Sequence, residues 1–388
     1  MAEETVPADS KGSEWHRWDP HIHTPGTLLN NQYKERDWDA YLSILENACP
    51  PVRALGITDY CVLRSYQEFR KRQAQGRASN VAFVFPNIEF RLSVETKSGK
   101  GINVHLLFSP HDNDHVEHIE RLLSNFKFNY RGIDYPCIPD WLIRLGKAAN
   151  PSLTDNEAAL RHGADQFKLD WNKLIETVNH DPWARDNCLL AISPHEKDGI
   201  GGLKHDGSFE AVREELKGQP HIIFSSNAGD REFWLGQKPG FDRDFIEATY
   251  GSLKPCLHGS DAHKLDEVLA PKHDRKCWIR AQLSFMGLKQ TLIEPELRVV
   301  IGAEPPPGPS PSECIRTIEV TNAPWLENVS LALNDGLVAI VGPKGSGKTA
   351  LADIIARAAG CSIQDESSFL HKADEHLMSN TRPAASSV

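Results

Sequence analysis

The sequence predicts an α/β fold, a largely parallel sheet or a barrel, followed by part of a second α/β unit. Short apolar runs rich in β-branched residues recur along the chain and alternate with helical patterns, which is the order typical of parallel sheets. A proline-rich segment at 303–313 separates this region from a shorter one that carries a glycine-rich turn between a predicted strand and a predicted helix.

Seven segments are predicted as buried strands because each is a short apolar run that ends at polar or turn residues. They lie near 16–22, 52–58, 81–86, 102–108, 188–193, 221–225 and 254–259. Helical patterns between most of them include 38–48, 116–126, 168–178 and 209–216. The region 110–187 is too long for one crossover, and we predict a mostly helical insertion there.

Residues 303–313 read AEPPPGPSPSE, a composition that stays extended and packs neither as a helix nor as a sheet. We therefore predict a flexible N-terminus at 1–13, a large domain at 14–302, a linker at 303–314 and an incomplete second domain at 315–388. In the second domain, IRTIEV and LVAIVG are predicted strands, Thr349 to Ala359 a helix, and the tail NTRPAASSV disordered.

Composition excludes several classes of protein. The chain has 388 residues, 43 Lys+Arg and 53 Asp+Glu, and its net charge of −10 argues against coating nucleic acid by bulk charge. No run approaches the roughly 18 apolar residues of a membrane span, and the first residues lack a signal-peptide pattern. The eight Cys form no CxxC pair. We expect a soluble, cytoplasmic protein with reduced thiols.

Histidines and acids fall in or just beyond the predicted strands. His21 and His23 stand in DPHIHT, where alternate strand residues point to the same face. The other candidates at strand ends are Glu89, His105, His195, Asp261 and His263. Because barrels place their active sites at strand ends, this pattern predicts a metal centre, with these seven residues as metal ligands and catalytic residues. The alternative is a set of core or surface histidines without a common partner.

A carboxylate that bridges two metal ions between imidazoles is what a multinuclear hydrolytic site requires. On these residues the sequence resembles the PHP (polymerase and histidinol phosphatase) superfamily, over about residues 14–302. The resemblance implies a distorted (β/α)7 barrel. It also implies a first metal held by His21, His23, Glu89 and Asp261, a second by Glu89, His105 and His195, and His263 at a third site.

The sequence departs from the family pattern at Tyr60, in ITDYC, where members commonly have His. We therefore expect two divalent ions, Zn or Mn with Fe as an alternative, and a Tyr60 that hydrogen-bonds substrate. Asp19 and Asp59 are interpreted either as groups that orient the imidazoles or as turn caps.

Three cations follow proposed ligands closely enough to hold a substrate phosphate: Arg91, Lys197 and Lys264. Each is singly more typical of plain surface. His111, His115 and His118 occupy a polar loop that leads into a helix, and a solvated helix start is favoured over metal binding there.

The second region contains GPKGSGKT, which matches the GxxxxGK[ST] phosphate-binding loop between a predicted strand and a predicted helix. The backbone N–H groups of such a loop surround phosphates, the Lys reaches the β and γ oxygens and the Thr holds Mg²⁺. The predicted nucleotide-binding residues are Gly342, Lys344, Gly345, Ser346, Gly347, Lys348 and Thr349.

Residues 315–360 resemble the first lobe of ABC- and SMC-like ATPases, but the residues after Thr349 hold no Walker B strand and no signature loop. The segment CWIRAQLSFMGLKQTLIEPELRV resembles the end of the PHP domain in bacterial PHP–SMC-type fusion ATPases (TrlF-like), a group that includes anti-phage defence proteins. We expect ATP with Mg to bind, and the rest of the ATPase head, or another protomer, to be needed for ATP hydrolysis.

The two motifs together predict a metal-dependent phosphoesterase, most simply a nuclease acting on DNA or RNA and coupled to an ATP-binding SMC-like module, with a role in anti-phage defence or DNA repair. A homo-oligomer is expected. One alternative is a small-molecule phosphomonoesterase of histidinol-phosphatase type. Another is an inactive PHP scaffold of an ATPase.

Overall fold

The computed structural model describes residues 11–34, 37–97, 99, 101–196, 199–203, 210–321 and 328–361. The chain forms two compact units that divide between Pro306 and Pro307. Among the described residues, no helix has both the length and the apolar character that a membrane span needs.

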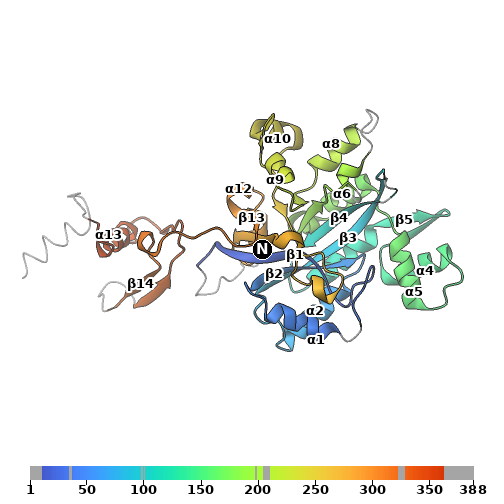
Figure 1. Ribbon diagram of the computed structural model, residues 1–388, viewed down its shortest axis with the longest axis horizontal. Coiled ribbons are helices and arrows are strands. Elements are labelled where there is room, and N and C mark those ends of the chain that lie inside the picture. Colours follow the sequence, from blue (N-terminus) through green and yellow to red (C-terminus); the bar gives the residue numbers. More distant parts are fainter. Residues whose placement is uncertain are drawn as a thin grey trace, which may run out of the picture. The chain divides into compact units, whose positions relative to one another are not determined.

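A nine-stranded sheet organises the first unit (Figure 1), in the order β11-β8-β7-β4-β3-β2-β1-β12-β13. All seven predicted strands are present in it. The strands are β1 (Glu14–His23), β2 (Val52–Tyr60), β3 (Phe83–Glu95), β4 (Gly101–Phe108), β7 (Cys188–Ile192), β8 (Ile222–Phe224), β11 (Cys256–Leu257), β12 (Lys276–Ala281) and β13 (Val299–Gly302).

The prediction of a largely parallel sheet is right except at β4 and at the C-terminal strands. The pairs β1–β2, β2–β3, β7–β8 and β8–β11 are parallel, whereas β4 pairs antiparallel with both β3 and β7. Only residues 96–100 connect β3 to β4. A parallel pair needs a crossover of a dozen or more residues, so this short connection forces a hairpin.

The sheet curls into a nearly closed barrel. Its two edge strands, β11 and β13, contact each other, and β12 lies antiparallel against the first half of β1. The second half of β1 is met by the loop that follows β11, where the N–H of Asp261 donates to the carbonyl of His21 at 2.9 Å. We call this contact between the loop and β1 the seam of the barrel. Asp19 strengthens it, because its carboxylate accepts the N–H of Ser260 at 3.0 Å.

Gly259 makes this close approach possible. A Cβ at this position would lie 2.4 Å from the carbonyl oxygen of His21 and 2.6 Å from Oδ1 of Asp19. Only a residue without a side chain lets the loop after β11 contact β1.

The barrel interior is filled by apolar side chains from all of the long strands. They belong to one cluster that includes Trp18, Phe83, Phe85, Leu107, Leu189, Ile222, Leu257 and Ile279. Because alternate strand residues point to opposite faces, the other face of the sheet is free to pack against helices.

Helices cover the outer face of the barrel (Figure 1). Helices α1 and α2 pack with the first strands and bury Tyr41, Leu42, Tyr66 and Phe69. The helices outside residues 109–187 are α1 (Asp37–Glu46), α2 (Arg64–Ala74), α8 (Glu210–Gly218), α9 (Ala228–Trp234), α10 (Arg243–Tyr250), α11 (Phe285–Gln290) and α12 (Pro295–Arg298), with 3₁₀ turns at Ile200–Gly202, Leu265–Glu267 and Lys272–Asp274. A two-residue hairpin joins β9 (Gln237–Lys238) and β10 (Phe241–Asp242).

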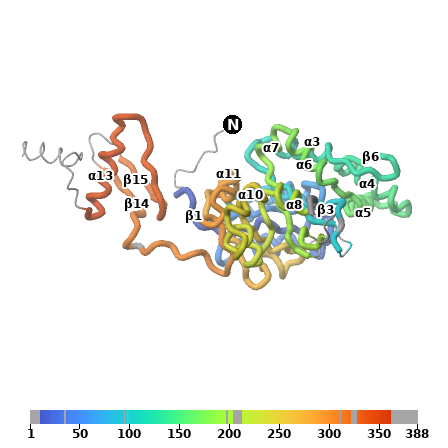
Figure 2. Tube along the Cα trace, turned by 90° about the horizontal axis from the view of Figure 1, so that it is seen from above, coloured from blue at the N-terminus to red at the C-terminus, as the bar shows by residue number. Residues whose placement is uncertain are grey.

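Between β4 and β7 the chain forms five helices and a hairpin. They are α3 (His115–Asn125), β5 (Lys127–Tyr130), β6 (Ile133–Pro136), α4 (Pro139–Ala149), α5 (Asn156–Gln166), α6 (Trp171–His180) and α7 (Pro182–Asn187). Figures 1 and 2 both show α4 and α5 side by side at the edge of the first unit, beside the β5–β6 hairpin. Helix α5 forms ion pairs with the barrel unit, from Asp165 to Arg91 of β3 and from Glu157 to Arg64 of α2.

The described residues of the second unit form a hairpin and one long helix. Strands β14 (Thr317–Val320) and β15 (Val329–Ala332) pair antiparallel, a 3₁₀ turn covers Pro311–Glu313, and α13 spans Lys348–Ala358 as predicted. The prediction of a strand at LVAIVG is wrong in the described structure, where 337–342 pairs with no strand. Leu337 and Val341 are 92 % and 86 % exposed, because no neighbouring strand completes a ladder.

Lys254 gives the first unit a pH-dependent stability. Its side chain is buried, and its Nζ donates to the carbonyls of Gly218 and Pro220 at 2.8 and 2.7 Å. Burial lowers the pKa of Lys254 to about 8. Between pH 8 and 10.5 the unfolded chain therefore holds a proton that the folded chain has released, so stability rises with pH.

We expect the free energy of unfolding of the wild type to rise by about 3 kcal/mol, relative to Lys254→Met, across this pH window. Urea denaturation of both proteins at several pH values measures the difference. A difference that stays constant from pH 8 to 10.5 would show that Lys254 is not titrated by folding.

Candidate metal centre

His21 and His23 lie at the carboxyl end of β1, where the strand is irregular. Pro20 has no N–H to donate, and the register of β1 against β2 shifts between Asp19 and Ile22. Ile22 packs in the apolar cluster that also contains the buried residues of α1 and α2. The two imidazoles lie on the opposite face of the strand, as their spacing predicts. Their Nε2 atoms lie 3.3 Å apart, and the His23 side chain is fully buried.

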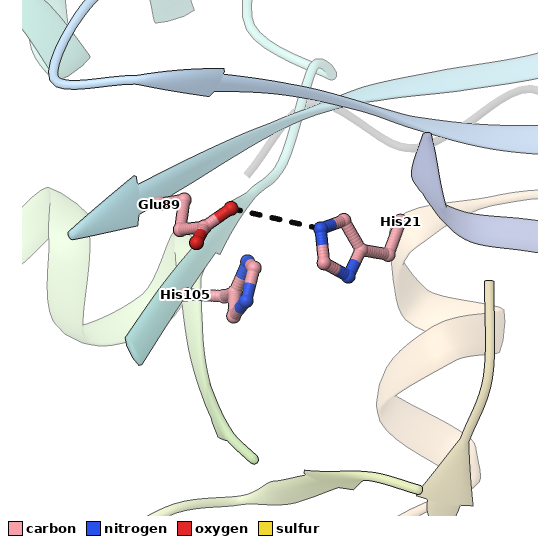
Figure 3. Close-up of side chains that lie close together, drawn as sticks. All are labelled: His21, Glu89 and His105. Carbon is pink, nitrogen blue, oxygen red and sulfur yellow. Dashed lines mark ion pairs between the residues drawn. The ribbon is translucent and has the colours of Figure 1, made fainter. Parts of the chain in front are cut away.

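Glu89 and His105 meet the histidines from β3 and β4. The two residues are direct partners in the antiparallel ladder, so their side chains lie on one face of the sheet. Figure 3 shows His21, Glu89 and His105 converging on one space from three strands. The Oε2 atom of Glu89 is 3.6 Å from Nε2 of both His21 and His23.

Asp261 completes the arrangement from the loop after β11. Its backbone adopts a φ of 51°, a left-handed conformation that Asp tolerates better than most residues. Its Oδ1 lies 3.3 Å from Nε2 of His21 and 3.6 Å from Nε2 of His23. The closing seam of the barrel thus carries one of the acids.

In the part of the chain that the structure describes, two groups of side chains have ligand atoms close enough to hold a metal ion, and they share His21. One group is His21, Glu89 and His105, and the other is His21, His23 and Asp261, with all ligand atoms of a group within 4.8 Å of one another. The sequence resemblance placed His105 and His195 together at a second site. In the structure His105 joins His21 instead, and His195 is outside both groups.

The electrostatics of the cluster fit a cation. The Oε2 atom of Glu89 is buried without a hydrogen-bond partner among the described residues, which is costly for a carboxylate unless a positive charge balances it. Burial alone would raise the pKa of Glu89, but the neighbouring His21 and His105 lower it to about 2. Imidazoles and carboxylates at these separations are the donor set of Zn²⁺ or Mn²⁺ sites.

The two acids act most strongly on the imidazole of His21. Burial opposes the protonation of His21, but the carboxylates of Asp261 and Glu89 outweigh it and raise its pKa to about 9. His105, by contrast, has a pKa lowered to about 3, by burial and by the charge of His21. The two carboxylates therefore favour positive charge next to His21, as a metal site requires.

Side chains behind the cluster fix the rings of His23 and His105. The Nδ1 atom of His23 lies 3.2 Å from the hydroxyl of Thr27, which is 3.5 Å from Oδ1 of Asp59. Asp59 also accepts the N–H groups of Leu28 and Tyr60, each at 2.8 Å. It therefore caps a turn and, through Thr27, orients an imidazole, so both interpretations of Asp59 apply.

Asn87 has the corresponding position behind His105. Its Oδ1 lies 3.1 Å from Nδ1 of His105, and its amide donates to the carbonyl of Pro20 at 3.0 Å. Asp19, in contrast, accepts the backbone N–H groups of His21 and Ser260. Asp19 therefore acts as a turn cap and does not contact an imidazole nitrogen by a hydrogen bond.

Aromatic rings enclose His23 and His21. The Tyr60 ring stacks on His23 with centroids 5.0 Å apart, and His263 stacks on His23 at 4.2 Å. Phe224 stacks on His21 at 5.4 Å. Nε2 of His263 is also 3.5 Å from Oδ1 of Asp261, so His263 belongs to the cluster without entering either ligand group. The role of Tyr60 that the structure describes is packing, and its contact with substrate stays a prediction.

The predicted phosphate clamps have other partners. Arg91 forms an ion pair with Asp165 of α5 at 3.2 Å, and Lys264 pairs with Asp266 at 3.1 Å. Lys197 lies outside the described residues. His115 bonds the hydroxyl of Tyr66 at 2.9 Å, and His118 stacks on Trp183, so both have structural partners away from the cluster.

In the second unit the loop at 342–347 leads directly into α13. Gly345 and Gly347 have φ angles of 85° and 84°, which glycine alone adopts without strain. The Nζ atom of Lys348 folds back onto the carbonyls of Gly342 and Pro343, each at 2.8 Å. Lys344, Ser346 and Thr349 lie in the same loop and first turn, and nucleotide binding there stays a prediction.

Sequence reasoning missed Thr27 and Asn87. The position of Thr27, four residues after His23, only weakly indicates that its hydroxyl contacts the imidazole. Asn87 lies two residues before Glu89 in β3, on the same face, but an amide in an apolar strand does not by itself indicate a partner.

Thr27→Val tests whether the hydroxyl orients His23. The substitution keeps the shape of the side chain and removes the bond to Nδ1, so we expect metal affinity to fall by about 10- to 100-fold. Titration with Zn²⁺ or Mn²⁺ followed by calorimetry measures the change. Thr27→Ser, which retains the hydroxyl, should restore most of the affinity, and equal losses in both variants would contradict the assignment.

No protein-family model matches the chain, and no curated protein matches it. Among solved structures it is similar to a provisionally named metal-dependent phosphoesterase of Bifidobacterium adolescentis, at 12 % identity and a TM-score of 0.33, over 72 % of this chain and 97 % of the other. It is also similar to PsfC of Pseudomonas syringae, at 14 % identity and a TM-score of 0.32, over 69 % of this chain and 82 % of the other.

Proposed function

We propose that the first unit is a metal-dependent phosphoesterase of the PHP type, which hydrolyses phosphodiester bonds of DNA or RNA. The observation that carries the proposal is the convergence of three histidines and two acids at one end of a curled α/β sheet. His21, His23, Glu89, His105 and Asp261 would hold two divalent ions. Bound there, such ions supply Lewis acidity to a phosphoryl oxygen and lower the pKa of a water molecule.

The side chains of the cluster have distinct tasks in this proposal. Glu89, at the centre, faces both histidines of β1 and the histidine of β4, whereas His21 is the residue that the two ligand groups share. Thr27 and Asn87 hold the Nδ1 sides of His23 and His105, which directs Nε2 of His23 into the site. Phe224 and Tyr60 form apolar walls that limit water.

His195 and His263 remain candidates for contact with substrate. His195 is exposed after the end of β7, and His263 stacks at the rim of the cluster. We place them at the leaving-group side, where an imidazole can donate a proton to the departing oxygen. Both follow the carboxyl ends of strands that run parallel to one another, β7 and β11.

The second unit is proposed to bind ATP with Mg through residues 342–349 and to couple this binding to the phosphoesterase. The loop glycines, the position of Lys348 and the start of α13 support it. A role in anti-phage defence or DNA repair, and a homo-oligomeric state, belong to the same proposal. The presence of a phosphate-binding motif in the same chain favours a nuclease over a free-standing metabolic phosphatase.

The test compares three substrates with Mn²⁺ or Zn²⁺ present: a labelled oligonucleotide, bis(4-nitrophenyl) phosphate and 4-nitrophenyl phosphate. The wild type should cleave the two diesters in preference to the monoester, and the double variant His21→Ala/His23→Ala should cleave none. ATP should alter oligonucleotide cleavage in the wild type and not in Lys348→Ala. Preference for the monoester would favour the phosphomonoesterase, and no cleavage together with no bound metal would favour the scaffold.

A further inference from the structure

A pocket with a volume of about 640 Å³ opens against the loop that follows β1 and its two histidines. It is lined by the loop from Pro25 to Tyr33, by Arg64 and Glu68 of α2, and by Arg161 of α5. Its size lies within the range of about 300–1,000 Å³ that is usual for small-molecule sites. The pocket therefore has room for a group of the substrate that does not itself react.

The wall of the pocket is bonded to the cluster. Thr27, between the lining residues Gly26 and Leu28, bonds Nδ1 of His23 at 3.2 Å. The hydroxyl of Tyr33 donates to the carbonyls of His23 and Ala262, at 3.2 and 3.1 Å. A molecule in the pocket thus lies against the same loop that positions His23.

The charges of the pocket favour an anion. Arg64 and Arg161 both face Glu157, at 2.7 and 3.5 Å, so two guanidinium groups share one carboxylate. Glu68 pairs with Arg72 at 2.9 Å. Counted with Arg72, three arginines therefore face two acids, Glu157 and Glu68.

The pairing with Glu157 is exchangeable. The Arg64, Arg161 and Glu157 side chains are 36 %, 57 % and 42 % exposed, and ion pairs at such positions contribute little stability. Guanidinium groups bind phosphate oxygens in a bidentate manner, with shorter and stronger hydrogen bonds than neutral donors form. A phosphate that enters the pocket can therefore replace the carboxylate of Glu157.

We propose that this pocket binds a phosphate group of the substrate other than the one that is hydrolysed, with Arg64 and Arg161 as its ligands and Glu157 as the acid that it displaces. The inference rests on the proposed phosphoesterase function. It narrows the substrate to molecules that carry at least two phosphates, of which a nucleic-acid strand with its repeated phosphates is the leading case.

The test uses three thymidine dinucleotides: one with a terminal 5′-phosphate, one with a terminal 3′-phosphate and one with neither. For the wild type we expect the KM of one phosphorylated form to be about tenfold lower than that of the form without a terminal phosphate. Arg161→Gln should remove this preference, and Glu157→Gln should increase it. Arg144→Gln, an exposed arginine on the neighbouring helix α4 that does not line the pocket, is the matched control and should keep the wild-type preference.

Calorimetric binding of the same dinucleotides to metal-free protein gives a second measurement that does not depend on turnover. Preferential binding of a phosphorylated form that is lost in Arg161→Gln would support the pocket even if no dinucleotide were cleaved, in which case only the proposed function fails. Cleavage of bis(4-nitrophenyl) phosphate with equal KM and equal binding for all three dinucleotides would overturn the pocket and leave the function intact.

Discussion

Glu89→Gln should reduce cleavage of bis(4-nitrophenyl) phosphate on the order of a thousandfold, because it removes the negative charge at the centre of the ligand cluster. The amide has the same shape as the carboxylate, so the barrel should fold as in the wild type. Its NH₂ group, however, cannot serve as a metal ligand, and one fewer metal ion per chain should copurify. Initial rates and elemental analysis of the purified protein measure the two effects.

Glu120→Gln is the matched control, since Glu120 is an exposed glutamate on α3 away from the cluster. It should keep the wild-type rate and metal content. If Glu89→Gln retained both, the carboxylate would be a buried structural group, and the two ligand groups would not act as a metal centre.

Gly259→Ala should unfold the seam of the barrel and abolish the site at the same time. The new Cβ would be 2.4 Å from the carbonyl oxygen of His21, so the loop after β11 must move away from β1. Overpacking of this kind costs about 3 kcal/mol. Because Asp261 follows two residues later and donates to the same carbonyl, its carboxylate should also leave the cluster.

Thermal melts and metal titration measure these two consequences separately. Gly218→Ala serves as the comparison, since a Cβ there meets no atom within 4 Å. That variant should melt within a few degrees of the wild type and bind metal normally. A Gly259→Ala protein of wild-type stability would mean that the contact between the loop and β1 is not needed to close the barrel.

The sequence was sufficient to predict the strands that carry the site. β-branched apolar runs and the two-residue period of β1 locate His21 and His23 on one face without any tertiary information. The antiparallel direction of β4 follows from the short connection at 96–100. The alternation of strands and helices along the chain does not predict it. For LVAIVG the local pattern was that of a strand, but a strand forms only where a neighbour offers hydrogen bonds.

The grouping of ligands was beyond sequence reasoning for a different reason. Which imidazole shares an ion with which carboxylate depends on register, and His105 faces Glu89 because β3 and β4 form a hairpin. Thr27, Asn87 and the Arg64–Glu157–Arg161 group act through contacts between segments far apart in the chain. Residue type alone does not identify such partners.

The seam between the loop after β11 and β1 has a consequence for protein synthesis. His21 and His23 leave the ribosome early, whereas Asp261 and the strand β12 that packs beside β1 emerge only near the end of the first unit. A nascent chain therefore contains most of the ligands long before it can assemble them. The complete cluster, with Asp261 in it, can therefore form only after the loop that follows β11 has been synthesised.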